Sequence, residues 1–498
     1  MEIKIKPLIT VIIIYMYLPL LIFFAGWLKP MIAVIAIVAM SFAVIRGLCS
    51  WFSEKPQSVY VTKGMIIGAI IFILFMCCLA GTGAFTEQTW DWNKHNAVLR
   101  DLMEQPWPVC YTNDYATAML SYYIGYYLLP AVTGKAFHSF RAAEITQFIC
   151  MAAGLLLVFF AVLHLCKAEG KKKQLLCLVS LFLFGGMLVL GQAVGGSLYP
   201  DGFPWGSHEW MNPEAVRIQY TANWSLLKWV PGQTLVPWLA TALLLMKPKK
   251  VETYVMVGLP VLMYSGFAMI GITVIMAAFL LYYSYEGIKN KNREERFFPF
   301  KMFSLSNILL VLSAGSILIL YFCGNLLGTK PDNLKLHFLN YGNMKIFYFI
   351  FCFFMFGCYA IIIWRKNKKN MVYWTVVVSL CLYPLFSMGL QNDFTMRASI
   401  PALFALMILC MRFLFEERGE TVRKTLLAVT LAIGMLSPLL NIREEIALYN
   451  KDGIHRRDDF ITLEQYADPL NPEIPDDMKY NYYSYDLDKD LFYRYLAK

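Results

Sequence analysis

The sequence has few charged residues for its length. Only 16% of its 498 residues are Asp, Glu, Lys or Arg, whereas 58% are hydrophobic. A soluble protein of this size needs a larger polar surface, so the composition excludes a soluble enzyme. A mean hydropathy of +0.52 and an aromatic content of 16% are typical of helices that contact lipid. We therefore predict an all-α polytopic membrane protein.

Several common signatures are also missing. The 12 cysteines contain no C-x-x-C pair, so neither a disulfide framework nor a zinc site is indicated. The absence of a G-x-x-x-x-G-K-[ST] loop argues against ATP-driven work. Lys and Arg are scattered in short runs between apolar stretches, which predicts topology signals and no nucleic-acid partner.

Apolar stretches of the about 17–25 residues that cross a bilayer occur eleven times. They lie at residues 8–28, 31–49, 64–84, 141–166, 174–192, 228–246, 303–327, 345–364, 371–388, 399–415 and 425–441. A twelfth stretch, 251–286, is flanked by basic residues at both ends, so we expect it to cross twice and to turn near Gly266. This predicts about 13 transmembrane helices, with a cytoplasmic N-terminus and an outer C-terminus.

Two further segments are expected at the outer face. Residues 115–133 are rich in tyrosine and are predicted to lie along the membrane interface as an amphipathic segment. The tail 442–498 holds eight Lys/Arg and thirteen Asp/Glu, a net charge of −5, which leaves +15 for residues 1–441. The tail is too short and too polar for a core of its own, so we expect a strap that lies over the outer loops.

The first outer loop contains the strongest candidate for chemistry. Glu87, Asp91 and His95 are spaced four residues apart and would share one face of a helix. A carboxylate partly dehydrated by Trp90 and Trp92 would be a poised general base. Two alternatives stay open: an interfacial helix whose polar face meets water, and a divalent metal site on the same three residues.

This layout resembles the GT-C superfamily of integral membrane glycosyltransferases. The resemblance covers residues 64–441 in layout and is strongest in the short stretches 91–102, 229–233 and 392–403. It differs in having two spans before the usual first helix. By this resemblance, we divide the chain into four parts. They are an N-terminal hairpin (1–63), a catalytic transmembrane module (64–300) with outer loops 85–140 and 193–227, C-terminal transmembrane helices (301–441) and the tail (442–498).

The resemblance implies a polyprenyl-phosphate-linked sugar donor in the cytoplasmic membrane of a bacterium. Asp91 would deprotonate the acceptor, assisted by His95 and Glu87. Arg397, Lys94 and Arg217 would bind the donor phosphate, because a planar guanidinium holds a phosphate bidentately. The residues expected to contact the substrate are Trp205, His208, Glu209, Asn392 and Asp393.

Plainer interpretations of these residues remain. Arg397 would equally pair with Asp393 or contact a lipid headgroup, and Lys94 would be solvated. The aromatic residues of loop 193–227 would form an interfacial belt. No metal ligand is assigned and no cofactor is required, although a divalent metal is possible.

We therefore expect an enzyme that moves a sugar from a polyprenyl-phosphate donor to a glycan, teichoic acid, lipid or protein at the outer face. One alternative is a polymerase or ligase of lipid-linked oligosaccharides. The other is a transporter or flippase, which would need ionisable residues within its spans, and these spans have almost none.

Overall fold

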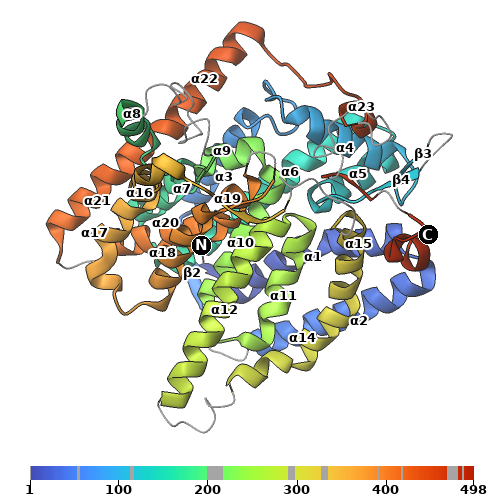
Figure 1. Cartoon of the computed structure of the whole chain (residues 1–498), viewed down its shortest axis with the longest axis horizontal. Coiled ribbons are helices and arrows are strands. Elements are labelled where there is room, and N and C mark those ends of the chain that lie inside the picture. The colour runs from blue at the N-terminus through green and yellow to red at the C-terminus, as the bar shows by residue number, and fades with distance from the viewer. Residues whose placement is uncertain are drawn as a thin grey trace.

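The computed structural model describes residues 2–52, 57–112, 117–198, 217–289, 298–326, 335–389, 392–416, 419–467, 481–484 and 487–498. Helices account for nearly all of the regular structure in these ranges (Figure 1). The prediction of an all-α polytopic membrane protein is confirmed at this level.

Helices follow one another along the chain with short connections. Before residue 250 they are α1 (Ile5–Trp27), α2 (Pro30–Trp51), α3 (Lys63–Leu79), α4 (Trp92–Glu104), α5 (Gly125–Phe137), α6 (Phe140–Cys166), α7 (Lys171–Leu183), α8 (Leu188–Leu198), α9 (Asn223–Trp229) and α10 (Leu235–Met246). After it they are α11 (Tyr254–Gly258), α12 (Gly266–Lys289), α14 (Leu305–Leu310), α15 (Ser316–Leu326), α16 (Lys345–Cys352), α17 (Cys358–Asn367), α18 (Met371–Leu382), α19 (Asp393–Ala398), α20 (Ile400–Phe415), α21 (Thr421–Gly434), α22 (Leu436–Asp452) and α23 (Leu463–Tyr466).

Within the described ranges, nine helical segments are long and apolar enough to cross a membrane. They are Ile5–Trp27, Pro30–Trp51, Phe140–Cys166, Lys171–Leu198, Gly266–Lys289, Leu305–Gly324, Lys345–Asn367, Asp393–Phe415 and Thr421–Lys451. A tenth would combine α9 with residues Pro231–Met246, which bend by 117° at a break between them. The count of 13, the direction of each crossing and the interfacial position of residues 115–133 stay predictions.

The stretch 251–286 breaks where a turn was expected. A helical run over Val251–Met263 ends before Tyr264 and Ser265, and α12 begins at Gly266. The Ser265 hydroxyl accepts a hydrogen bond from the Ala268 amide (3.2 Å), which satisfies one of the free N–H groups at the start of α12. A Cβ at Gly266 would lie 2.7 Å from the Tyr123 hydroxyl, so a larger residue there would have to displace the Tyr123 side chain. α11 and α12 then lie side by side (Figure 1).

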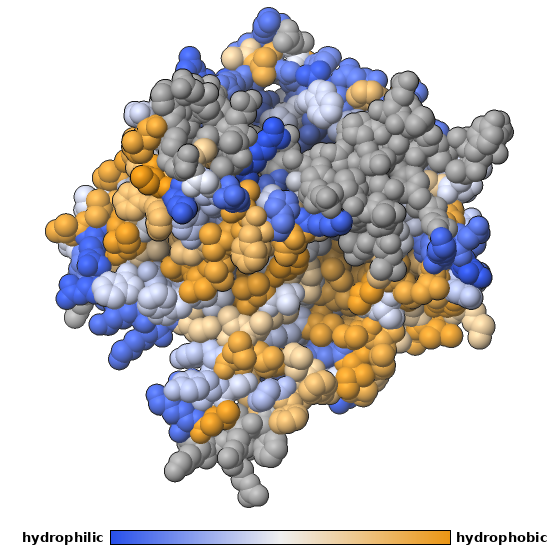
Figure 2. All heavy atoms as spheres, in the orientation of Figure 1, coloured by the Kyte–Doolittle hydropathy of each residue, from blue (hydrophilic) through white to orange (hydrophobic). Residues whose placement is uncertain are grey.

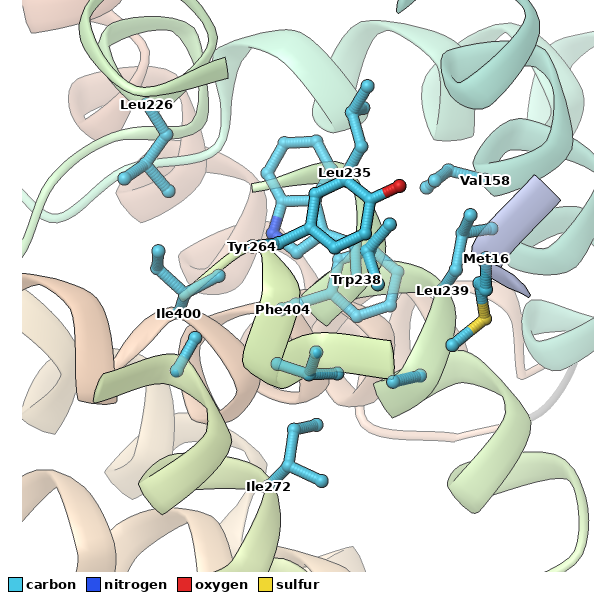
Figure 3. Packing of buried hydrophobic residues seen from close by; sticks show 14 of the residues in the cluster. Met16, Val158, Leu226, Leu235, Trp238, Leu239, Tyr264, Ile272, Ile400 and Phe404 are labelled. Atoms are coloured by element: carbon cyan, nitrogen blue, oxygen red, sulfur yellow. The ribbon is translucent and has the colours of Figure 1, made fainter. Parts of the chain in front are cut away.

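The centre of the molecule is a closely packed apolar core between α1, α6, α10, α12 and α20 (Figure 3). Trp238 of α10 stacks on Phe404 of α20 with ring centroids 5.6 Å apart. Every residue of α10 from Leu235 to Leu244 is buried, so this helix is surrounded by protein. Close packing of this kind holds helices together where lipid supplies no hydrophobic drive.

The outer surface has the opposite character. α2 exposes a row of large apolar side chains: Met31, Val34, Ile35, Val38, Phe42 and Ile45. Figure 2 shows apolar residues in a broad band across the middle of one face, with hydrophilic residues gathered above it and at its lower end. Such a band is expected where lipid chains contact a protein, so the chain is a multi-pass membrane protein in contact with lipid.

Short strands join distant parts of the chain. Three antiparallel pairs or ladders form from β1 (Glu2–Lys4) with β2 (Ser58–Tyr60), β5 (His337–Phe338) with β6 (Phe386–Ser387), and β3 (Cys110–Thr112), β4 (Thr117–Leu120) and β7 (Tyr483–Ser484). β7 belongs to the tail and pairs with β4, opposing Ser484 to Met119. α4, α5 and α23 gather with this sheet at one end of the molecule, opposite the end where α12 finishes (Figure 1).

Candidate functional site

The candidate site is built around the start of α4. The helix begins at Trp92, and its first turn continues back to Asp91, whose carbonyl accepts from the His95 amide (3.3 Å). Asp91 and His95 therefore lie one turn apart. The expectation that Glu87 shares this face is wrong, because Glu87 lies in irregular chain before the helix. There the Gln88 side chain donates to the Gly81 carbonyl (3.0 Å) and holds the chain in a turn.

The Asp91 carboxylate is half-buried. Across the described ranges, no side chain or amide forms a hydrogen bond or ion pair with it. Glu87, in contrast, pairs with Arg457, 3.7 Å from Oε1 to Nη2. A carboxylate without a partner keeps its lone pairs available to accept a proton, which a general base requires.

Lys94 lies three residues further on and is only 6% exposed. Its ammonium has no hydrogen bond or ion pair with any described group. Burial lowers the pKa of Lys94, but Asp91, Tyr122 and Tyr466 outweigh burial, so that its pKa lies above the ordinary value. Lys94 is therefore charged, and a buried charge without a direct counter-ion favours binding of an anion.

Arg397 brings a second cation to the same place. It lies on α19, and its Nη1 donates to Asp393 Oδ2 at 3.0 Å, so the expected pair with Asp393 forms. Its Nε is buried and has no partner within the described chain. The charge of Arg397 acts on Lys94 and His95, so these side chains lie within electrostatic range of one another although α19 and α4 are far apart in the sequence. The guanidinium is thus only partly neutralised beside a buried ammonium.

His95 is held from both sides. One ring nitrogen, Nε2, lies 3.0 Å from the Trp229 carbonyl, and Nδ1 contacts the Tyr127 hydroxyl. Burial, together with the charges of Lys94 and Arg397, lowers the pKa of His95 well below its ordinary value, so the ring is neutral. A carbonyl only accepts, so Nε2 carries the proton and Nδ1 accepts from the Tyr127 hydroxyl. With both nitrogens engaged, His95 is a positioning residue for α4.

The carbonyl of Trp229 is available because the chain breaks there. α9 ends at Trp229 and turns sharply into α10, which leaves the last carbonyls of α9 without helical partners. A buried ion pair between Lys228 and Glu445 joins α9 to α22. His95 and this ion pair therefore fix the end of α9 against two other helices.

Of the remaining sequence candidates, the structure describes two, Asn392 and Arg217. Asn392 is buried, and its amide donates to the Arg217 carbonyl (2.9 Å) while its Oδ1 accepts from the Met388 amide (3.3 Å). Asn392 therefore shapes the turn that precedes α19. The side chain of Arg217 is exposed. Trp205, His208 and Glu209 lie outside the described residues.

The structure also brings to the site four tyrosines that were not among the candidate residues. Tyr466 and Tyr482 come from the tail and lie within electrostatic range of Asp91. Tyr122 and Tyr123, expected at the membrane interface, lie near Arg397. The only sequence signal for these residues was the high tyrosine content of the two segments. It did not indicate which tyrosines would lie at the site.

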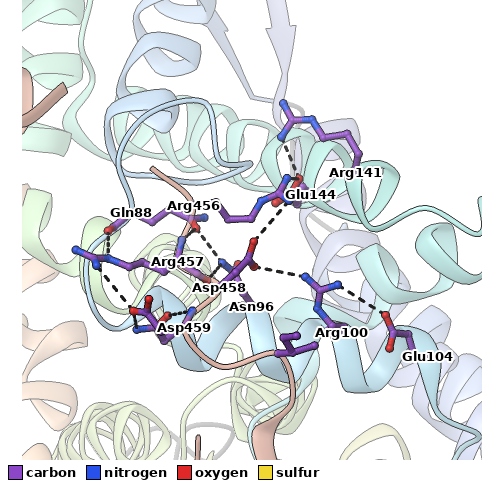
Figure 4. A network of polar contacts seen from close by, with 12 residues as sticks. Gln88, Asn96, Arg100, Glu104, Arg141, Glu144, Arg456, Arg457, Asp458 and Asp459 are labelled. Atoms are coloured by element: carbon purple, nitrogen blue, oxygen red, sulfur yellow. Dashed lines mark hydrogen bonds and ion pairs between the residues drawn. The ribbon is translucent and has the colours of Figure 1, made fainter. Parts of the chain in front are cut away.

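Polar contacts hold the tail segment 455–459 against α4 and α6 (Figure 4). Asp459 receives a hydrogen bond from Asn93 (2.9 Å), and Asp458 lies 3.4 Å from Arg100. Arg457 donates to the Gln88 carbonyl (3.0 Å). The tail is therefore fixed next to the candidate site by polar contacts with α4 and with the chain that precedes it.

The most buried charged member of this network is Glu144 of α6. Its Oε2 accepts from Arg456 at 2.8 Å and from Arg141 at 3.0 Å. Glu144→Gln removes the buried charge, so that Arg141 loses its carboxylate partner and Arg456 keeps only its longer pair with Asp458 (3.7 Å). We therefore expect a loss of about 1–3 kcal/mol in the free energy of unfolding. Thermal unfolding in detergent measures this loss, and limited proteolysis should cleave the tail of the variant faster.

Glu104→Gln is the matched control. Glu104 is half-exposed, and its Oε1 lies 3.8 Å from Arg100. Exposed pairs of this kind contribute little, so no measurable change is expected. Equal unfolding midpoints for the two variants would show that Glu144 does not hold the tail.

Asp101 of α4 supplies a pH-dependent contact with the tail. Its Oδ2 accepts from the Tyr111 hydroxyl (2.6 Å) and from the Leu463 amide (2.9 Å). Burial raises the pKa of Asp101 to about 6, although both hydrogen bonds oppose the rise. Because the unfolded carboxyl titrates near pH 4, the folded state binds the extra proton between about pH 4 and 6.

The free energy of unfolding should therefore fall as the pH rises through this window, by on the order of 3 kcal/mol from this group. Asp101→Asn keeps the accepting oxygen but does not titrate, so its unfolding midpoint should fall less than that of the wild type between pH 4 and 7. An unchanged pH dependence in Asp101→Asn would assign the effect to other groups.

Within the ranges that the structure describes, no three His, Cys, Asp or Glu side chains gather in a way that could hold a metal ion. Comparison with known proteins gives no match among family models, curated proteins or solved structures. The functional argument therefore rests on the geometry of Asp91, Lys94 and Arg397.

Proposed function

We propose that the protein is a membrane glycosyltransferase that moves a sugar from a polyprenyl-phosphate donor to a hydroxyl acceptor at the outer face of a bacterial cytoplasmic membrane. The acceptor would be a glycan, teichoic acid, lipid or protein of the cell envelope. One observation carries this proposal: the buried cation Lys94 lies within electrostatic range of a partly buried cation, Arg397, and of Asp91, a carboxylate that forms no hydrogen bond or ion pair with a described group.

In the proposed reaction, the Asp91 carboxylate takes the proton from the acceptor hydroxyl. The acceptor oxygen then attacks the anomeric carbon of the sugar and forms the new glycosidic bond. The bond from that carbon to the phosphate oxygen breaks, and polyprenyl phosphate leaves with the electron pair. Protons and charges balance, because the proton stays on Asp91 until product release.

The two cations would act on the leaving group. Negative charge grows on the phosphate as the bond breaks, and preorganised donors in a site that excludes water stabilise it. Lys94 supplies a point charge, and Arg397 supplies its Nη2 group, because its pair with Asp393 is made by Nη1. Since Asp393–Phe415 is apolar enough to span the membrane, Arg397 would meet a phosphate at headgroup depth.

The polymerase or ligase alternative uses the same chemistry with a longer donor, and the geometry does not favour it. A transporter or flippase would need charged residues along a path between the two faces. Each of the nine candidate spans in the described ranges contains an 18-residue window with at most two charged residues. This distribution favours chemistry at one end of the molecule over transport through it.

Donor consumption tests the proposal. Purified protein in lipid vesicles receives radiolabelled sugars linked to polyprenyl phosphate (glucose, galactose, mannose and arabinose), with a bacterial envelope extract as acceptor. We expect label from at least one donor to enter envelope material, with release of an equal amount of polyprenyl phosphate. A protein that consumes none of the four donors would contradict the proposal for these sugars, and consumption without transfer would contradict the acceptor step.

A further inference from the structure

A row of aromatic side chains leads from the surface to within electrostatic range of Lys94 and Arg397. It begins at Trp90, which is half-exposed, and continues to Tyr466 with ring centroids 5.6 Å apart. Tyr466 lies 6.2 Å from Tyr482, and Tyr482 lies 5.0 Å from Tyr122. The last three rings are buried. Two members of the row, Tyr466 and Tyr482, belong to the tail.

The backbone fixes these two tail residues. The Ser121 amide donates to the Tyr482 carbonyl at 2.8 Å, next to the pairing of β7 with β4. Tyr466 ends α23, which packs on α4. The tail therefore covers the site with defined side chains, in positions set by a strand pair and a helix contact.

The hydroxyl groups of the row lie among the charges of the site. Tyr122 and Tyr466 are both within electrostatic range of Lys94, and Tyr482 is within range of Asp91 and Arg397. The Tyr122 hydroxyl has no hydrogen-bond partner in the described chain, although the residue is 7% exposed. The Tyr466 and Tyr482 side chains form a hydrogen bond with each other, so the two phenols of the tail are held together next to these charges.

We propose that the tail completes the site, and that Trp90, Tyr466, Tyr482 and Tyr122 bind the sugar ring of the donor. The inference rests on the proposed function. The sugar is one bond from the phosphate, so groups that adjoin Lys94 and Arg397 are those that the ring would meet. Aromatic faces pack against the C–H faces of a sugar, and phenol hydroxyls hydrogen-bond to its hydroxyl groups.

The experiment compares two kinds of ligand on the full chain in nanodiscs. Polyprenyl phosphate without a sugar tests the cation site, and the same lipid carrying glucose, galactose, mannose or arabinose tests the aromatic row. For the wild type, we expect one of the glycosylated lipids to bind about tenfold more tightly than the sugar-free lipid, equivalent to about 1.4 kcal/mol. Trp90→Ala and Tyr466→Phe should reduce this preference at least threefold without changing the affinity for the sugar-free lipid.

Tyr495→Ala is the control, because Tyr495 is an exposed tail residue outside the row. It should keep the full preference for the glycosylated lipid. If both Trp90→Ala and Tyr466→Phe keep the preference for the glycosylated lipid, the inference is overturned but the proposed function is not. Equal binding of all lipids to the wild type would have the same consequence. Failure of the wild type to bind any of the lipids would overturn the proposed function and the inference with it. Trp90→Ala changes a half-exposed surface residue, so misfolding is not expected to obscure the result.

Discussion

Asp91→Asn is expected to lower kcat for sugar transfer by about 100- to 10,000-fold, the range over which general bases contribute. Asparagine has nearly the same shape as aspartate but takes no proton from a hydroxyl. The affinity for the donor should stay within about threefold of the wild type, because no described group depends on the Asp91 carboxylate for a hydrogen bond or ion pair. The measurement is kcat and donor KM in vesicles.

Two controls separate chemistry from folding. Glu104→Gln changes a half-exposed carboxylate on the same helix and should leave kcat unchanged. The unfolding midpoint of Asp91→Asn should match that of the wild type. Near-normal transfer by Asp91→Asn would remove Asp91 from the role of base.

Replacing either cation is expected to weaken use of the donor. Lys94→Met keeps the volume of the buried chain but removes its charge, and Arg397→Gln removes the guanidinium next to Asp393. Each loses a charge-assisted contact with the phosphate worth about 1.5–3 kcal/mol, which corresponds to about a 10- to 100-fold loss in kcat/KM for the donor. Acceptor KM should change much less.

Arg397→Lys refines this prediction. A lysine keeps the charge but offers no planar fork, so donor use should recover only in part. Asp393→Asn provides a further comparison, because it frees Nη1 of Arg397 without removing the cation. An effect of Lys94→Met and Arg397→Gln confined to the acceptor would exclude these residues from the phosphate site.

The sequence predicted the fold class because lipid imposes its constraint on composition. Long apolar runs with few charges have no other stable environment, so they indicate helices that cross a membrane. The break near Gly266 was visible for a similar reason, since Gly258, Pro260 and Gly266 interrupt an apolar run too long for one crossing. These signals are local and need no knowledge of the tertiary contacts.

The candidate site was predictable only in part. Asp91, Lys94 and Arg397 stand out because charged residues are rare near apolar spans. The four-residue spacing of Glu87 from Asp91 gave a wrong prediction. The chain around Glu87 is held in a turn by the contact of Gln88 with Gly81, and the helix begins only at Trp92. Periodicity shows which face residues share only where a helix exists.

The contribution of the tail could not be read from the sequence. Tyr466 and Tyr482 reach the site through the pairing of β7 with β4 and through contacts of α23 with α4. Contacts between segments so far apart leave no periodic pattern, and the two-residue strand β7 is too short to be recognised. The hydrogen bond of His95 was hidden from the sequence for a similar reason. Its partner is the Trp229 carbonyl, which lies at the break between α9 and α10.

The most direct test of the account is the affinity of the wild type in nanodiscs for polyprenyl phosphate, compared with the uncharged polyprenol of the same length. The two lipids differ only in the phosphate, so the comparison isolates the contribution of the cations Lys94 and Arg397. We predict that polyprenyl phosphate binds at least 10 times more tightly, since one charge-assisted contact is worth about 1.5–3 kcal/mol, and that Lys94→Met abolishes most of this difference. Equal affinities for the two lipids would contradict a phosphate site at these residues, and with it the proposed transfer from a phosphate-linked donor.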